Sequence, residues 1–175
     1  EATALAAEVP LWRLAALNAR TEVLAVVEPD AEGECSTAVF APAGWAPPES
    51  IQTWDWHETL SNETVVRTLR TAAGTRIVTF CEFGQPAKIG VNDRGLGVHF
   101  NILHHRADGT RAGVPVHVLA RMILDSARTI DEAAAIARDV PLAASSVLTV
   151  ATFDGEQAAA AAIEVSPERI AVLPA

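Results

Sequence analysis

A single thiol stands where a polar segment of this chain gives way to an apolar one. Cys35 follows the turn-prone residues 28–33 and precedes the apolar residues 36–40. A cysteine at the first residue of a strand has its thiol at an edge that solvent and substrate reach, whereas one inside a strand is usually a small core side chain. Cys35 is therefore a candidate nucleophile.

A carboxylate between two indoles is the second feature with chemical meaning. Asp55 lies between Trp54 and Trp56 in the short segment 50–57, which has the pattern of an extended run. We predict that Asp55 orients polar groups around the thiol and that the two indoles contact substrate. The alternatives are a turn-capping role for Asp55 and, for the indoles, the commoner task of burying apolar area.

A nucleophilic cysteine also needs a base for its proton and donors for the tetrahedral oxyanion. If the bond between Glu34 and Cys35 is cleaved, the new α-amino group of Cys35 can serve as that base. A papain-type pair with His57 is disfavoured, because the papain cysteine begins a helix. Asn101, which follows a predicted strand, is placed to donate an amide N–H to the oxyanion, although it could equally be a strand-ending residue that bonds the local backbone.

Composition restricts the class of protein. With 175 residues, of which 50% are hydrophobic, the chain is predicted to form one globular domain over residues 1–175. The net charge of -9 and the pI of about 4.9 argue against nucleic acid as a partner, since phosphate backbones select clustered Lys and Arg. No apolar run reaches the roughly 18 residues of a membrane span, and no leader segment opens the chain. We therefore expect a cytoplasmic protein that does not enter membranes.

Disulfide and metal chemistry are not indicated by the sequence. Cys35 and Cys81 are too few for a disulfide framework, and no C-x-x-C pair is present. Adjacent imidazoles such as those of His104 and His105 point apart on a strand, and neither they nor His99 have a carboxylate at ligand spacing. We expect no metal and no cofactor.

Apolar spacing and turn residues predict the elements that would position these groups. Helices are expected at 4–18, from Pro115 onward, and from a capping box at Thr129 to about Arg138. Strands are expected at 21–27, 36–40, 52–56, 65–69, 76–80, 88–91, 96–100, 146–153, 158–165 and 169–173. Hairpin turns are expected at 72–74, 92–95 and 154–155. Two helices set between runs of strands favour an α+β fold with a mostly antiparallel sheet.

Five of these segments, taken in order, resemble one known family. They are GECST at 33–37, QTWDW at 52–56, KIGVNDRGLGV at 88–98, NIL at 101–103 and GVP at 113–115. This order is similar to that of the acyl-coenzyme A:6-aminopenicillanic acid acyltransferase-like family, the C45 cysteine peptidases, which include carcinine and β-alanyl-amine hydrolases. The resemblance spans roughly residues 10–170.

The resemblance carries expectations about fold and site. It implies an N-terminal-nucleophile (Ntn) hydrolase, with an αββα sandwich of antiparallel sheets of which this chain holds a part. It implies self-cleavage between residues 34 and 35, with Cys35 as the nucleophile and Asp55 as its orienting acid. Similarity to the bile-salt hydrolase branch in residues 92–101 implies Asn101 as an oxyanion donor.

The function expected from this resemblance is hydrolysis or acyl transfer at the amide bond of a small N-acyl amine, through a thioester on Cys35. Family members continue past a strand such as 169–173, so a C-terminal half or a second subunit is an expected partner, and a homo-oligomer is left open. Two alternatives remain. One is a non-catalytic relative that binds a small ligand or partner, and the other is a domain whose task is subunit assembly.

Overall fold

The structure, a computed structural model, describes residues 1–27, 35–56 and 58–174. Its helices are α1 (Ala2–Ala6), α2 (Leu11–Asn18), α3 (Arg20–Val27), α4 (Val116–Ser126) and α5 (Ile130–Arg138), with a short 3-10 turn at Glu58–Leu60. Its strands are β1 (Thr37–Phe40), β2 (Glu49–Gln52), β3 (Thr64–Arg70), β4 (Arg76–Glu82), β5 (Ile89–Asn92), β6 (Leu96–Ile102), β7 (Ser146–Phe153), β8 (Ala158–Val165) and β9 (Ile170–Pro174).

Seven of the strands form one antiparallel sheet in chain order, from β3 to β9. Each strand pairs with the next one along the chain, as hairpin connections require. The turn between β5 and β6 contains Gly95 at φ +83°, and a Cβ at that position would lie 2.1 Å from the carbonyl oxygen of Phe153. Only glycine fits there, because the backbone is left-handed and the neighbouring strand is in contact.

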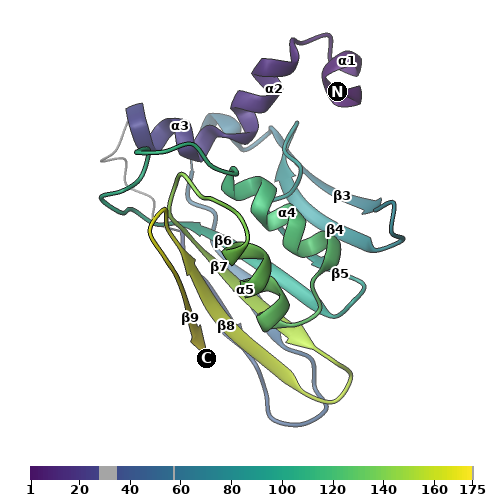
Figure 1. The fold of residues 1–175 in the computed structure, drawn as a ribbon. Coiled ribbons are helices and arrows are strands. Elements are labelled where there is room, and N and C mark those ends of the chain that lie inside the picture. Colours follow the sequence, from purple (N-terminus) through teal and green to yellow (C-terminus); the bar gives the residue numbers. More distant parts are fainter. Residues whose placement is uncertain (28–34, 57, 175) are drawn as a thin grey trace.

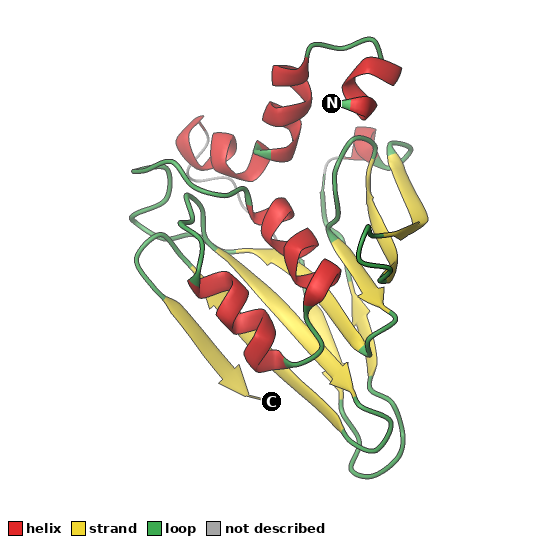
Figure 2. Cartoon of the chain, turned by 45° about the vertical axis from the view of Figure 1, so that its right-hand side comes forward, coloured by secondary structure: helices red, strands yellow, loops and turns green. Residues whose placement is uncertain are grey.

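Helices α4 and α5 lie across one face of this sheet (Figure 1). Alternate residues of β6 point toward them, and Leu96, Val98 and Phe100 are almost fully buried. Leu119 and Ile123 of α4 meet that face with no exposed surface. This layer forms the hydrophobic core. In a view turned by 45°, the two helices again lie over the strands (Figure 2).

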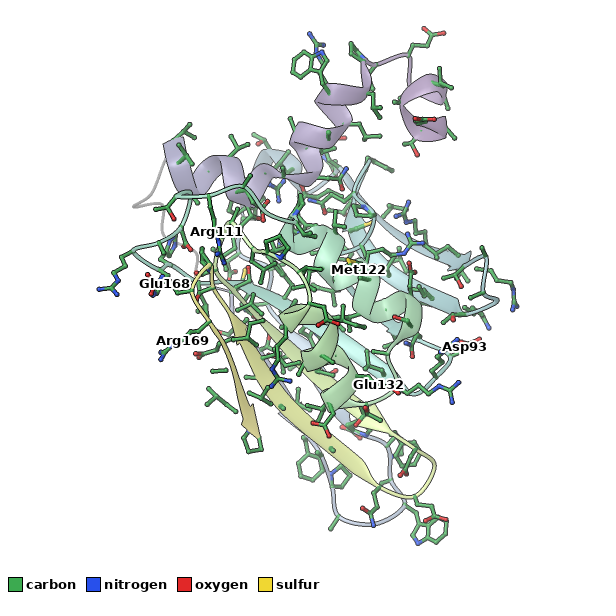
Figure 3. The ribbon with its side chains drawn as sticks, viewed as in Figure 1. Asp93, Arg111, Met122, Glu132, Glu168 and Arg169 are labelled. Atoms are coloured by element: carbon green, nitrogen blue, oxygen red, sulfur yellow. The ribbon has the colours of Figure 1, made fainter. Side chains whose placement is uncertain are left out.

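The first turn of α5 shows why the helix begins where the sequence predicts. The Thr129 hydroxyl accepts a hydrogen bond from the backbone N–H of Glu132 at 3.1 Å. The Glu132 carboxylate accepts in turn from the backbone N–H of Arg128 at 2.7 Å, one residue earlier than the ideal capping box would have it. Figure 3 places Glu132 at this end of α5.

The other face of β6 carries the two-stranded ribbon of β1 and β2. Because side chains alternate along a strand, His99 and Asn101 point away from the helices. His99 contacts Ser50 and Gln52 of β2, and Asn101 contacts Thr37 of β1. The ribbon therefore packs on the sheet opposite to α4 and α5.

The predicted strand at 21–27 is wrong, because these residues form helix α3. Its first three residues reach distant parts of the chain. Arg20 pairs with Glu82, Thr21 lies 3.5 Å from His117, and a Glu22 carboxylate oxygen accepts from the backbone N–H that opens α4. Consecutive side chains of a helix leave the axis about 100° apart, so Arg20, Thr21 and Glu22 reach three different neighbours. These contacts override the β-branched composition of the segment.

Three further boundaries differ from the sequence prediction. The helix expected at 4–18 is interrupted at residues 7–10, where Glu8 has φ +53° and Pro10 caps α2. The strand expected at 52–56 is shifted, since β2 ends at Gln52. The β7–β8 turn has four residues instead of two, because Phe153 pairs with Ala158.

The α+β class with a large antiparallel sheet is confirmed, and it is compatible with an Ntn-type sandwich. The antiparallel hairpins at 72–74 and 92–95 and both core helices are also confirmed. Among the described residues, no helix has both the length and the apolar character that a bilayer crossing requires.

Candidate active site

The antiparallel pairing of β1 and β2 brings the candidate thiol and carboxylate segments together. Thr37 pairs with Gln52, so the residues just before β1 lie beside those just after β2. The Cys35 thiol donates to the backbone carbonyl of Asp55 at 3.7 Å, and Cys35 is half-buried. The proximity of the two segments, predicted from the hairpin spacing, is confirmed. Glu34, on the other side of the expected cleavage bond, lies outside the described residues, as does His57.

The Asp55 carboxylate reaches the neighbour of the nucleophile through one hydroxyl group. The Thr53 hydroxyl donates to the Asp55 carboxylate at 2.9 Å and accepts from the backbone N–H of Ser36 at 3.0 Å. Asp55 is otherwise exposed. The carboxylate is thus tied to the backbone that carries Cys35 without being buried itself.

Asn101 sits on β6 opposite the start of β1. Its side-chain oxygen accepts from the Thr37 hydroxyl at 2.6 Å, and only 7% of the residue is exposed. Within the part of the chain that the structure describes, the Asn101 Nδ2 group has no hydrogen-bond partner. The Asn101 amide is therefore held beside Thr37, which follows the candidate nucleophile by two residues.

A further polar contact fixes the ribbon on the sheet. The Gln52 amide donates to the Phe100 carbonyl at 2.6 Å and accepts from the Phe100 N–H at 3.3 Å. This orientation leaves the Gln52 oxygen to accept from His99 Nδ1 at 3.1 Å, so the proton of a neutral His99 lies on Nδ1. His99 Nε2 then accepts from the Ser50 hydroxyl at 2.8 Å. These hydrogen bonds between the β1–β2 ribbon and β6 fix the position of β1, at whose start Cys35 lies.

Three charged groups gather beneath the indole segment. Both terminal guanidinium nitrogens of Arg20, Nη1 and Nη2, donate to the Glu82 carboxylate, one of them at 2.9 Å, and Lys88 Nζ lies 3.2 Å from the same carboxylate. The side chains of Glu82 and Lys88 are each 5% exposed. We name Arg20, Glu82 and Lys88 the buried charge triad.

Each cation of the triad is covered by one of the two indoles. Lys88 Nζ lies 4.7 Å from the ring centroid of Trp54, and the Arg20 guanidinium lies 4.9 Å from that of Trp56. Trp54 also packs edge-to-face on Phe80, with centroids 5.5 Å apart. The two indoles flanking Asp55 therefore rest on cations that share one carboxylate.

Burial and charge shift the pKa values of this cluster. Burial alone would raise the pKa of Glu82, but Arg20 and Lys88 outweigh it and hold that pKa below its ordinary value. Burial lowers the pKa of Lys88, although the Glu82 carboxylate opposes that effect. Burial likewise lowers the pKa of His117 to about 3, with the charges of Lys88 and Arg20 acting in the same direction. His117 is thus neutral behind the site.

The sequence reasoning found part of this arrangement. It singled out Cys35, Asp55 and Asn101, but not the triad, and it treated Lys88 only as one letter of a motif. A usable signal was present, since Lys88 is the only lysine of the chain. Among the described residues, no group of three or more His, Cys, Asp or Glu side chains is placed to hold a metal ion.

The family described as acyl-coenzyme A:6-aminopenicillanic acid acyl-transferase matches residues 46–173, which is more than half of the chain. The chain belongs to this family. The acyltransferase family indicates an enzyme of the acyltransferase or hydrolase type. The match contains Asp55, Asn101 and Lys88, whereas Cys35 and Arg20 precede it.

Proposed function

We propose that this member of the acyltransferase family is a cysteine amidohydrolase or acyltransferase, which opens the amide bond of a small N-acyl amine through a thioester on Cys35. The observation that carries the proposal is the convergence of three groups on the start of β1. They are the half-buried Cys35 thiol, the Asp55 segment whose carbonyl lies 3.7 Å from it, and the Asn101 amide held by Thr37. A nucleophile, an orienting acid and an oxyanion donor are the parts that acyl transfer needs.

The base for this reaction comes from processing of the chain. In the intact chain the nitrogen of Cys35 is an amide, which cannot accept a proton. Cleavage of the bond between residues 34 and 35 frees an α-amine on the same residue as the thiol. That amine takes the thiol proton as the sulfur attacks the substrate carbonyl.

The acyl group then passes through two tetrahedral intermediates. In the first, the carbonyl oxygen carries the negative charge, and the Asn101 amide N–H groups donate to it. The C–N bond breaks, the leaving amine takes the proton from the α-ammonium of Cys35, and the acyl group stays on sulfur as a thioester. Water or an acceptor amine, deprotonated by the same α-amine, attacks the thioester and returns the thiol.

Asp55 and the two indoles have assigned places in this scheme. The Asp55 carboxylate, tied to Ser36 through the Thr53 hydroxyl, holds the α-ammonium of Cys35 in place. Trp54 and Trp56 are half-buried, and their indoles supply apolar surface for the apolar part of the substrate. The -9 net charge of the chain favours a neutral or cationic amine over an anionic one.

A second candidate function, subunit assembly, is favoured by the outer face of the ribbon. Phe40 and Ile51 are 66% and 70% exposed there, and the nearby Trp45 is 76% exposed. Such side chains on a two-stranded ribbon fit an interface with further strands, either from the rest of the protein or from a second subunit. Assembly and catalysis are compatible, and only catalysis requires the Cys35 thiol.

The test compares the full-length protein with its Cys35→Ala and Cys81→Ala variants on a panel of N-acyl amines, with amine release as the readout. Cys81 is the matched control, because it is the other cysteine of the chain and is completely buried. We expect Cys35→Ala to abolish amine release and Cys81→Ala to retain it. Equal activity in the Cys35→Ala variant would contradict the cysteine mechanism.

A further inference from the structure

The only lysine of this chain is buried. Lys88 is 4% exposed, although lysine is almost never fully buried unless it is paired. Its partner is Glu82, at 3.2 Å, and that carboxylate is already bonded on both oxygens by Arg20. Lys88 therefore shares a carboxylate whose charge Arg20 alone could balance.

The buried charge triad carries one positive charge in excess. Two cations face one carboxylate, and the ring face of Trp54, which also contacts Lys88, compensates a charge only in part. An uncompensated charge away from water is costly, so such an arrangement is most stable beside a negative charge. The group that supplies this negative charge therefore indicates which part of the site the triad serves.

Two contacts connect Lys88 with Cys35. Trp54, which covers the ammonium group, is followed by Asp55, whose backbone carbonyl accepts from the Cys35 thiol. The charge of an ionised Cys35 also raises the pKa of Lys88, against the lowering caused by burial. The ammonium and the sulfur therefore interact across the Trp54–Asp55 segment.

We propose that Lys88 is a positioning residue for the reaction at Cys35, with its ammonium fixed by Glu82 and Trp54 so that its charge offsets the negative charge that develops on the sulfur. This inference rests on the proposed function. Glu82 holds the ammonium in place, Arg20 balances Glu82, and the indole of Trp54 excludes water from the charge, which strengthens its effect. Lys88 acts through the sulfur and does not contact the substrate.

The first test observes Lys88 directly and does not depend on catalysis. Full-length protein labelled with 13C at lysine Cε gives one resonance for each lysine of the whole protein, and the resonance that is lost in Lys88→Arg is that of Lys88. The midpoint of its pH titration is compared between wild type, Cys35→Ala and the control Glu156→Gln. Glu156 is exposed in the β7–β8 turn, so its variant removes a distant negative charge.

We expect the Cys35→Ala variant to lower the midpoint of the Lys88 titration, because the negative charge that favours the ammonium form is then absent. Glu156→Gln should leave it unchanged. An unchanged midpoint in Cys35→Ala would overturn the interaction on which the proposal stands. This result is independent of activity, so it is distinguishable from a failure of the cysteine mechanism.

The second test measures reaction rates at the thiol. Alkylation of Cys35 by iodoacetamide at pH 7, followed by peptide mass spectrometry, is compared for wild type, Lys88→Met and Lys88→Arg. We expect alkylation and kcat to fall about tenfold in Lys88→Met with little change in KM, and Lys88→Arg to recover most of both because it keeps the charge. Wild-type alkylation in Lys88→Met, or loss in Lys88→Arg equal to that in Lys88→Met, would refute a role for the charge.

Discussion

Acid conditions should destabilise this protein through His117. The imidazole has no exposed surface, and its centroid lies 4.9 Å from that of Phe100, while Nε2 lies 3.5 Å from the Thr21 hydroxyl. Its pKa is lowered to about 3 in the folded chain, first by burial and then by the positive charges of Lys88 and Arg20. The unfolded chain therefore binds a proton at this site well before the folded chain does.

The sign and size of the effect follow from that difference. A histidine with a lowered pKa in the folded state costs no stability above about pH 6.5, and it costs about 1.4 kcal/mol for each pH unit below that value, until the folded pKa is reached. At pH 5 the loss is about 2 kcal/mol, a large share of the roughly 5 to 15 kcal/mol that hold a domain folded. His99, whose pKa is also lowered by burial, acts in the same direction, and Glu22, whose pKa burial raises, acts in the opposite one.

A variant isolates the contribution of His117 from these others. His117→Gln keeps a polar atom near Thr21 but removes the titration. Urea denaturation of both proteins, followed by tryptophan fluorescence at pH 7.5 and at pH 5, gives the free energy of unfolding in each case. We expect the wild type to lose about 2 kcal/mol more than His117→Gln between the two pH values. Equal losses in the two proteins would refute the assignment of a neutral, buried His117.

Three other substitutions test the fold and the site. Asn92→Ala should lower the free energy of unfolding by about 2 to 4 kcal/mol, because this side chain makes four hydrogen bonds that join the end of α4 to the β5–β6 turn. A loss below about 1 kcal/mol in urea denaturation would show that these bonds are dispensable. Gly95→Ala should prevent folding, as judged by circular dichroism, since its Cβ would meet the Phe153 carbonyl. Thr37→Val should lower kcat about tenfold with little change in KM, because the Asn101 amide loses the hydrogen bond that orients it. An unchanged kcat would contradict the role of Asn101 as an oxyanion donor.

The local signals of the sequence account for most of the sheet and the two core helices. Gly95 with its positive φ fixes one hairpin, and Thr129 with its hydroxyl bond fixes the start of α5. Such signals act within a few residues, so they can be recognised without knowing the fold. The proximity of Cys35 to Asp55 follows for the same reason, because one loop joins the two paired strands.

The parts that the sequence did not predict depend on distant contacts. Residues 20–27 have strand-like composition, yet Arg20, Thr21 and Glu22 bond groups that lie 62, 96 and 94 residues away. Those contacts select a helix that local propensity does not favour. The buried charge triad escaped prediction because it joins α3 with β4 and the loop after it, so no single segment contains its pattern.

The central claim is that Cys35 carries the acyl group, and one measurement tests it most directly. Full-length protein is mixed with an N-acyl amine that it turns over, quenched with acid within one turnover, and mapped by peptide mass spectrometry. We predict an acyl mass on the peptide that begins with Cys35 as its free N-terminus, removable by hydroxylamine as expected of a thioester. Acylation of another residue, or turnover by a chain still uncleaved before Cys35, would contradict the account.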